Sequence, residues 1–339
     1  MSFMIRKGKI NDLTDIQNLI CSVNHVNFSL DYLSWLLQDP FDSNQLNSLV
    51  LLDNGRLIGH VGYIKSHYQA EGNVLSGSHP FLLAILSEYR GLGLGKELLL
   101  QAASIGDISL IFEGTQDAIK VYPGVGYKKI LNLRLYRKWL NWPIPEQIKS
   151  QSLKMYGYNL ITLLINMSFF KVPANKKTDR LPLVFSDYSL ENTEFFTGLD
   201  ARISNIPKKE TIEWFLQCPT LKALSLRVGE DKFDLGILMM YINDHGKYKT
   251  GRILHLPNCG GNEQKWRLVL KEAEFYFHKE GCNQVSVCSS HPIYTKVLFG
   301  MGYLPMSTRA IWLRDPDNLT LDKEWHVTYL EGDNGFRGV

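Results

Sequence analysis

The sequence has little net charge, and it has no basic run that would suggest a nucleic-acid partner. The 37 basic and 34 acidic residues leave a formal net charge of only +3, and charged residues make up 21% of the chain. A nucleic-acid-binding surface needs clustered lysines and arginines, and none are clustered here. With hydrophobic residues at 45%, the composition also argues against a disordered or collagen-like chain. We therefore expect a globular protein that does not bind nucleic acid.

Cysteine is also scarce, and its spacing excludes two common structural roles. The five cysteines are odd in number and contain no CxxC pair; they are Cys21, Cys218, Cys259, Cys282 and Cys288. Neither a disulfide framework nor a zinc ribbon is indicated, so we predict no metal site. Reduced thiols are typical of the cytoplasm, which is the location we expect.

Long apolar runs are missing as well. Residues 1–15 are polar and charged, without the apolar core of a signal peptide, so we expect no export by that route. Residues 153–170 approach the length of a membrane helix, but polar residues and a glycine interrupt them, whereas a span needs roughly 20 apolar residues. We interpret this segment as a core helix between domains and predict no integral span. Peripheral membrane contact is the second interpretation.

An internal repeat is present in the sequence. Residues 31–40 read DYLSWLLQDP and residues 210–219 read ETIEWFLQCP, so that Trp35 and Trp214 occupy matching places 179 positions apart. Two further pairs keep nearly the same offset: LIGHVGY (57–63) with LGILMMY (235–241), and GVGYKKI (124–130) with GMGYLPM (300–306). A register held over this distance predicts two copies of one fold.

The repeat divides the chain into three parts. We expect one domain at residues 1–140, a linker with an apolar helix at 141–180, and a second domain at 181–339, in agreement with a length about twice that of a single domain. In the first copy, Asn11 or Asp12 is placed to cap a helix, and Asp53-Asn54-Gly55 is a hairpin signal. Expected strands are 4–6, 49–52, 57–63, 80–86 and 109–112, and expected helices are 13–23, 32–38, 95–105 and 115–122. This order predicts an α/β fold with a mixed, α+β type of sheet.

Three glycines form the most informative local pattern. Gly91, Gly93 and Gly95 follow an apolar strand and precede an amphipathic helix. Glycines let the backbone approach a ligand closely, and the N–H groups at a helix start attract anionic oxygens, so this loop predicts a phosphate-binding site. It is not a P-loop, because Glu97 rather than Ser or Thr follows Lys96. Lys96 also stands where the dinucleotide fingerprint needs its third glycine.

The loop resembles the acetyl-CoA signature Q/R-x-x-G-x-G/A of the GNAT superfamily of N-acetyltransferases, matched here by Arg90, Gly93 and Gly95. The flanking LAILSEYRGLGLGKELL agrees with the strand, loop and helix of that family. Further on, VYPGVGYKKI (121–130) is similar to its Y-x-x-x-G-F/Y segment. The resemblance covers about residues 3–135, and with the repeat it predicts a tandem GNAT architecture whose second copy is degenerate.

The resemblance implies an acyl-CoA-dependent N-acyltransferase that uses acetyl-CoA or another acyl-CoA and no metal. The acceptor amine attacks the thioester, a backbone N–H of the strand at 83–85 polarises the carbonyl, and Tyr122 protonates the departing thiolate. A tyrosine hydroxyl (pKa ~10) stays protonated at neutral pH and can donate to a thiolate (pKa ~8.5). Residues implied to bind the cofactor are Leu83, Ile85, Arg90, Gly91, Leu92, Gly93, Leu94, Gly95 and Lys96.

The general base is less clearly indicated. The strand at 81–86 has no carboxylate, and Glu113 and His79 are the nearest candidates. A water relay, or an amine that is already neutral, is the alternative.

The second copy lacks the same features. Residues 258–263 read NCGGNE at the place of the Arg90 loop, and Leu298 stands at the place of Tyr122. We therefore predict that this copy has lost CoA chemistry and helps to shape the acceptor site.

The acceptor is predicted to be an amine of a small molecule. The tail WHVTYLEGDNG (325–335) is similar to acyltransferases of cell-surface polysaccharide assembly, which suggests an amino sugar. A hydroxyl or thiol acceptor stays open, because a fold does not select the nucleophile. The alternative function is a non-catalytic acyl-CoA sensor or scaffold. A peptide-bond former that uses aminoacyl-tRNA is disfavoured by the lack of a basic channel.

Overall fold

The structure is a computed structural model that describes residues 3–39, 42–70, 73–140, 183–187, 202–230, 233–246, 248–257, 259, 262–320 and 322–331. The predicted linker and the apolar segment at 153–170 lie outside the described residues. Among the described residues, no helix is both long and apolar enough to cross a membrane.

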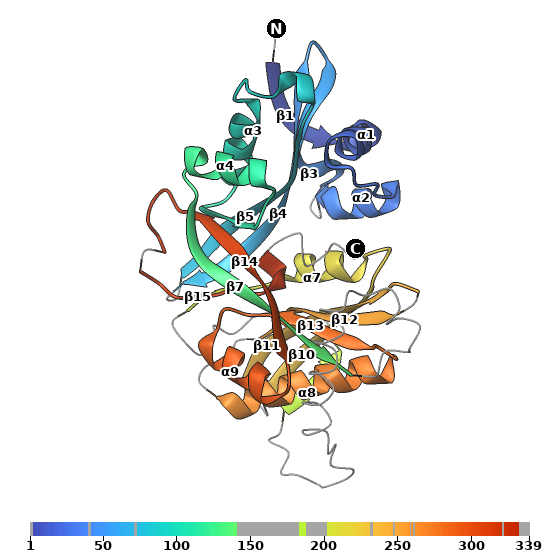
Figure 1. Cartoon of the computed structure of the whole chain (residues 1–339), viewed down its shortest axis with the longest axis vertical. Coiled ribbons are helices and arrows are strands. Elements are labelled where there is room, and N and C mark those ends of the chain that lie inside the picture. Colours follow the sequence, from blue (N-terminus) through green and yellow to red (C-terminus); the bar gives the residue numbers. More distant parts are fainter. Residues whose placement is uncertain are drawn as a thin grey trace, which may run out of the picture.

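The first half of the chain forms the upper part of the molecule in Figure 1. Its strands are β1 (Phe3–Lys9), β2 (Gln38–Asp39), β3 (Asp42–Asp53), β4 (Arg56–Ala70), β5 (Asn73–Ile85), β6 (Ile108–Phe112) and β7 (Lys128–Trp139). Its α-helices are α1 (Leu13–Asn24), α2 (Leu30–Leu37), α3 (Leu94–Ala103) and α4 (Gln116–Val125), with short 3-10 turns at Ile10–Asp12 and Ser87–Tyr89. Helices α1 and α2 lie on one side of the sheet, and α3 and α4 on the other (Figure 1).

The second half lies below it. Its strands are β8 (Leu183–Asp187), β9 (Ile203–Asn205), β10 (Lys222–Glu230), β11 (Phe233–Asp244), β12 (Lys249–His255), β13 (Gln284–Cys288), β14 (Leu304–Arg314) and β15 (Trp325–His326). Its α-helices are α7 (Lys209–Leu216), α8 (Glu263–Lys279) and α9 (Pro292–Gly300), and a 3-10 turn follows at Tyr329–Glu331. The order β10-β11-β12-α8-β13-α9-β14 repeats the order β3-β4-β5-α3-β6-α4-β7 of the first half.

One mixed sheet runs through both halves, as the α/β prediction required. Its strands follow the order β1-β3-β4-β5-β6-β14-β7-β13-β12-β11-β10-β8. The last strands of the two halves have changed places: β14 pairs with β6, β7 pairs with β13, and β14 and β7 pair antiparallel with each other. Figure 1 shows these two strands crossing between the halves. Each half therefore depends on a strand from the other.

The two matching tryptophans of the repeat meet at the contact between the halves. The rings of Trp35 and Trp214 stack with centroids 4.7 Å apart and planes 5° apart. Each indole Nε1–H donates to the backbone carbonyl of the other residue, at 2.6 Å from Trp35 and 2.7 Å from Trp214. Both side chains are buried, so the pair satisfies two polar groups within an apolar core. The contact is reciprocal, as expected for equivalent positions related by a two-fold axis.

Most predicted elements of the first half are confirmed: the strands are longer than predicted, and the helices agree with the prediction within about three residues at each end. Strands β3, β4 and β5 differ most, since β3 begins at Asp42, β4 ends at Ala70 and β5 begins at Asn73, each well beyond the predicted range. Strand β5 pairs antiparallel with β4 along almost its whole length. The hairpin turn is confirmed at Asn54 and Gly55, which both have positive φ, at 50° and 85°.

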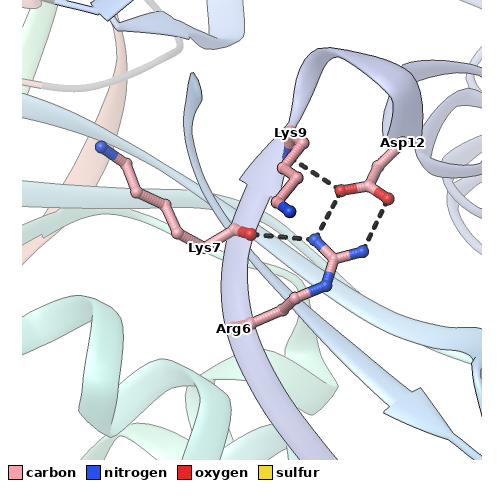
Figure 2. A network of polar contacts seen from close by, with 4 residues as sticks. All are labelled: Arg6, Lys7, Lys9 and Asp12. Atoms are coloured by element: carbon pink, nitrogen blue, oxygen red, sulfur yellow. Dashed lines mark hydrogen bonds and ion pairs between the residues drawn. The ribbon is translucent and has the colours of Figure 1, made fainter. Parts of the chain in front are cut away.

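The predicted cap of α1 is wrong in its chemistry. Asp12 occupies the N-cap position, but its side chain makes no cap hydrogen bond. Figure 2 shows its carboxylate accepting two hydrogen bonds from the Arg6 guanidinium, at 2.7 and 2.8 Å, and one from the Lys9 N–H at 2.8 Å. The carboxylate binds the charged, bidentate Arg6 of β1 instead of the N–H groups at the helix start. These contacts hold the pKa of Asp12 below its usual range, the Arg6 hydrogen bond most strongly.

Candidate functional site

The glycine loop and the predicted catalytic residues line one cavity of about 940 Å³ in the first half. It lies where two strands separate, because β5 and β6 are paired only at Gly77–Ile108 and Ser78–Ser109. Beyond those pairs, β5 residues 79–83 and Ile85 form one wall and β6 residues 110–112 form the opposite wall. A parallel pair that opens along its length leaves backbone groups without strand partners, and an extended ligand can lie between them.

The loop at one end of this cavity has the backbone of an anion-binding turn. Gly91 and Gly93 have φ of 83° and 78°, in the left-handed region, and Gly93 is the N-cap of α3. A Cβ at either glycine would meet nothing within 4 Å, so backbone conformation and not crowding requires glycine there. No side chain caps α3. The N–H groups of its first turn are therefore available to a ligand.

Two cations stand beside this loop. Arg90 and Lys96 are both exposed and both line the cavity. The Arg90 Nε–H donates to the carbonyl of Ile85 at 3.3 Å, which directs the side chain back over the end of β5. Of the nine residues expected to bind cofactor, eight line the cavity. The side chain of the ninth, Leu92, is 54% exposed and lies outside it.

Tyr122, which also lines the cavity, is held by a hydrogen bond and by aromatic neighbours. Its hydroxyl donates to the carbonyl oxygen of Glu113 at 2.9 Å. The ring is buried against Trp312 and Tyr127, at centroid distances of 5.5 and 5.7 Å. Gly114 makes room for it, since a Cβ there would lie 2.2 Å from the hydroxyl oxygen. The position of this hydroxyl is thus set from several directions.

The two predicted bases line the cavity, and both have partners. The Glu113 carboxylate forms an ion pair with Arg309 of β14. The backbone N–H of Glu113 donates to the carbonyl oxygen of Ala310 at 2.8 Å. Glu113 also has a positive φ of 64°, which is uncommon for a residue with a side chain. His79 is buried, and its Nε2 lies 2.9 Å from the hydroxyl of Tyr68.

Two candidate functional residues were not predicted from the sequence. Arg309 belongs to the second half, and only the exchange of β14 brings it to Glu113. His60, on β4, is fully buried with its Nδ1 3.2 Å from the carbonyl oxygen of Leu82, and burial lowers its pKa to about 4. No local pattern marks either residue, because each meets its partner through strand pairing, of β14 with β6 for Arg309 and of β4 with β5 for His60.

The corresponding helix start in the second half is already occupied. The side chain of Asn262, the N-cap of α8, accepts hydrogen bonds from the N–H groups of Gln264 and Lys265 at 3.0 and 3.1 Å. Glu263 adds a negative charge and pairs with Lys296 of α9. Leu298, at the place of Tyr122, is fully buried. This helix start does not present the unpaired donors that α3 does.

The C-terminal tail packs between the halves. Trp325 and His326 of β15 are buried, and the Trp325 ring meets that of Tyr68 edge-on at 5.5 Å. Tyr329 stacks on Phe112 of β6 with ring centroids 6.3 Å apart. A second cavity, of about 780 Å³, is lined by β7, β14 and the residues before β15. The described part of this tail thus serves as packing beside the end of β6.

Comparison with known proteins identifies the family of the first half and the fold of the whole. Residues 11–127 match the model of the acetyltransferase (GNAT) family. A solved GCN5-related N-acetyltransferase from Anabaena variabilis is similar over 95% of this chain and 75% of its own, with 13% identity and a TM-score of 0.59. Saccharomyces cerevisiae N-myristoyltransferase with bound myristoyl-CoA is similar over 93% and 83%, with 14% identity and a TM-score of 0.56.

A third similar structure is a probable N-acyltransferase of unknown function from Enterococcus faecalis. It has 13% identity and a TM-score of 0.55, and the match covers 92% of this chain and 72% of that one. At these identities the structures show the fold alone. The family predicted from the Arg90 loop is confirmed for the region that carries the loop.

Proposed function

Starting from a GNAT acetyltransferase domain in residues 11–127, we propose that the protein transfers an acyl group from acyl-CoA to an amine of a small molecule. The observation that carries this proposal is the cavity between β5 and β6, which joins the glycine loop to Tyr122. A thioester cofactor needs anion-binding groups at one end and a proton donor near its sulfur at the other. The glycine loop and the Tyr122 hydroxyl, the candidates for these two roles, line one continuous space.

The cofactor would bind by its phosphates at the start of α3. The N–H groups that follow Gly93 would donate to pyrophosphate oxygens, and Arg90 and Lys96 would add positive charge at the rim. The pantetheine arm would then lie between the separated strands, where it can pair with backbone groups of β5. The thioester would then lie beside Leu82 and Leu83, which line the same cavity.

The reaction would proceed by direct attack. The lone pair of the acceptor nitrogen forms a bond to the thioester carbon, the C–S bond breaks, and the thiolate takes a proton from the Tyr122 hydroxyl. The nitrogen loses a proton to His79, Glu113 or water. Because Glu113 is paired with Arg309 and His79 with Tyr68, each could relay a proton only together with its partner.

We propose acetyl-CoA as the first donor to test and an amino sugar as the first acceptor class. We propose the cytoplasm as the place where the protein acts. Apolar residues such as Val26, Phe81 and Phe112 also line the cavity, so a longer acyl chain is the matched alternative. A donor series of acetyl-, octanoyl- and myristoyl-CoA would separate these cases.

We also infer that residues 181–339 are a second GNAT-like fold without CoA chemistry. The repeated element order, the exchanged last strands and the reciprocal tryptophan pair support a duplication. The capped start of α8 supports the loss of the CoA site. The second half would act by supplying β14, and with it Arg309, to the first.

The proposal is tested by thiol release from each acyl-CoA in the presence of amino sugars, polyamines and amino acids, with the acylated product identified by mass spectrometry. We expect amine-dependent release in the parent and a loss of turnover in Tyr122→Phe without a matching loss of cofactor binding. Binding of acyl-CoA with no release for any amine would instead support the sensor or scaffold function.

A further inference from the structure

Strand β5 contains a local distortion where it faces the cavity. Pairing with β4 runs through His60–Ala84 and resumes at Gly62–Phe81, so Leu82 and Leu83 together lie opposite Val61. This is a β-bulge, and such an extra residue leaves backbone groups outside the ladder. Leu82 and Leu83 both line the cavity, so the freed groups are next to the space proposed for the thioester.

The bulge has an unfavourable backbone that needs support. Leu82 has φ of 50°, in the left-handed region that a residue with a Cβ rarely adopts. It is not glycine, and it is buried within a strand and not placed in a turn. Such a conformation persists where neighbouring groups hold it, and it is found mainly at functional sites.

The imidazole of His60 contacts this residue directly. Its Nδ1 lies 3.2 Å from the carbonyl oxygen of Leu82. A carbonyl can only accept, so Nδ1 carries the proton and donates. The other ring nitrogen, Nε2, is buried and has no hydrogen-bond partner among the described residues. Burying an imidazole for a single hydrogen bond is costly, which argues that the contact serves more than packing.

The second half supplies an internal comparison. Its equivalent strands, β11 and β12, show a register shift between Met239 and Met240, at the place that matches the bulge of the first half. In the alignment of residues 57–63 with 235–241, Leu238 stands where His60 does. Leu254, the extra residue of this shift, is not among the described residues with positive φ. The second half also has a buried histidine at its shift, His255, but it stands on β12 opposite Met239. A histidine at the position of His60 and a left-handed residue therefore occur together in the half that has the glycine loop.

We propose that His60 is a positioning residue for acyl transfer: its Nδ1–H holds the Leu82 carbonyl and so fixes the bulge that turns backbone N–H groups of Leu82 and Leu83 toward the thioester oxygen. These N–H groups stabilise the negative charge that develops on this oxygen when the amine attacks. The inference rests on the proposed function. His60 itself would not touch the substrate, but it would set the geometry of the backbone N–H groups that do.

The test compares three variants of the full chain. His60→Leu removes the donor, and His60→Asn keeps an N–H donor near the position of Nδ1. His255→Leu is the control, because His255 is also buried, with its pKa lowered by burial to about 3, but it lies on β12 of the second half. For each variant we would measure kcat, the Kd for acetyl-CoA, and amide hydrogen exchange of residues 80–86.

We expect His60→Leu to lower kcat at least about tenfold, since removing one oxyanion donor outright costs roughly 100- to 1000-fold and here the donors are only displaced. The Kd should stay within about twofold, and exchange at 80–86 should become faster. His60→Asn should recover most of the lost kcat and of the protection, and His255→Leu should match the parent. A rate that recovers with the donor cannot come from packing volume alone.

Two results would overturn the proposal. One is a His60→Leu variant with parental kcat and exchange. The other is a loss of kcat and of affinity by the same factor that His60→Asn does not reverse, as expected for general damage to the fold. If the parent transfers no acyl group to any amine, the proposed function fails, and the catalytic part of this inference fails with it. Faster exchange in His60→Leu would still show that His60 holds the bulge.

Discussion

Replacing Gly114 with alanine should remove most of the acyl-transfer activity while the protein stays folded. The backbone of Gly114 does not have positive φ, so alanine fits the main chain. Its Cβ, however, would lie 2.2 Å from the hydroxyl oxygen of Tyr122 and 3.0 Å from the ring carbon that bears it. Ordinary contact begins near 3.4 Å, so the hydroxyl must move by about 1 Å. The hydroxyl is the group that we propose as the proton donor to the thiolate.

The size of the effect follows from this displacement. A misplacement of about 1 Å in a reacting group can cost roughly 100-fold in rate. Loss of a general acid altogether, as in Tyr122→Phe, costs about 100- to 10,000-fold. The strain of the added methyl group is worth about 1–3 kcal/mol, below the roughly 5–15 kcal/mol that keeps a domain folded. We therefore expect kcat to fall about 100-fold, with little change in the Kd for acetyl-CoA.

The assay is thiol release under saturating acetyl-CoA and acceptor, with the unfolding midpoint measured in parallel. Gly124→Ala is the matched control on α4, because its Cβ would meet Lys96 at an ordinary 3.6 Å. In the double variant with Tyr122→Phe, Gly114→Ala should add almost nothing, since both act on one hydroxyl. A Gly114→Ala variant with parental kcat, or losses that multiply in the double variant, would refute the role given to Tyr122.

Three further predictions concern the halves and their charges. Trp35→Phe and Trp214→Phe each remove one buried indole hydrogen bond, so each should lower the free energy of unfolding by about 1 kcal/mol; urea titration of the double variant should show coupling, and strict additivity would contradict the paired contact. His60 is neutral in the fold with a pKa of about 4 against 6.5 when unfolded, so the free energy of unfolding should fall as pH drops from 6.5 to 4, by roughly 3 kcal/mol at most from this group. His60→Leu should flatten that decline, and an unchanged pH profile would count against the buried, neutral state. Arg309→Gln should raise the Kd for acetyl-CoA several-fold by leaving the charge of Glu113 unbalanced, and Glu113→Gln in the same chain should restore it in a titration.

The local elements and the glycine loop could be predicted because their causes are local. Gly91 and Gly93 have the left-handed backbone that only glycine adopts freely, and Asn54-Gly55 forms the turn that its dipeptide favours. Trp35 and Trp214 were matched by register alone, and they meet in space. For these features, the periodicity and turn chemistry of short segments were enough to predict the local structure.

The features that were missed depend on contacts between elements that no local pattern specifies. Nothing within the sequences of β7 and β14 states which strands each one pairs with, so the exchange and the Arg309–Glu113 pair were not foreseen. Asp12 was expected to cap α1, yet Arg6 on a neighbouring strand offered a charged, bidentate partner. Leu82 adopts a left-handed φ that its residue type disfavours, within a bulge whose carbonyl contacts His60. Tertiary contacts overrode local preference at each of these positions.

The central claim is that the first half holds one working acyl-CoA site. Isothermal titration of the protein with acetyl-CoA and with free CoA tests it most directly, with Arg90→Glu as the site variant and Lys271→Glu, an exposed charge reversal on α8 of the second half, as the control. The account predicts one site per chain, at least about tenfold weaker in Arg90→Glu because a charge-assisted contact to phosphate becomes a repulsion, and unchanged in Lys271→Glu. Absence of binding, or equal affinity in Arg90→Glu and the parent, would contradict it.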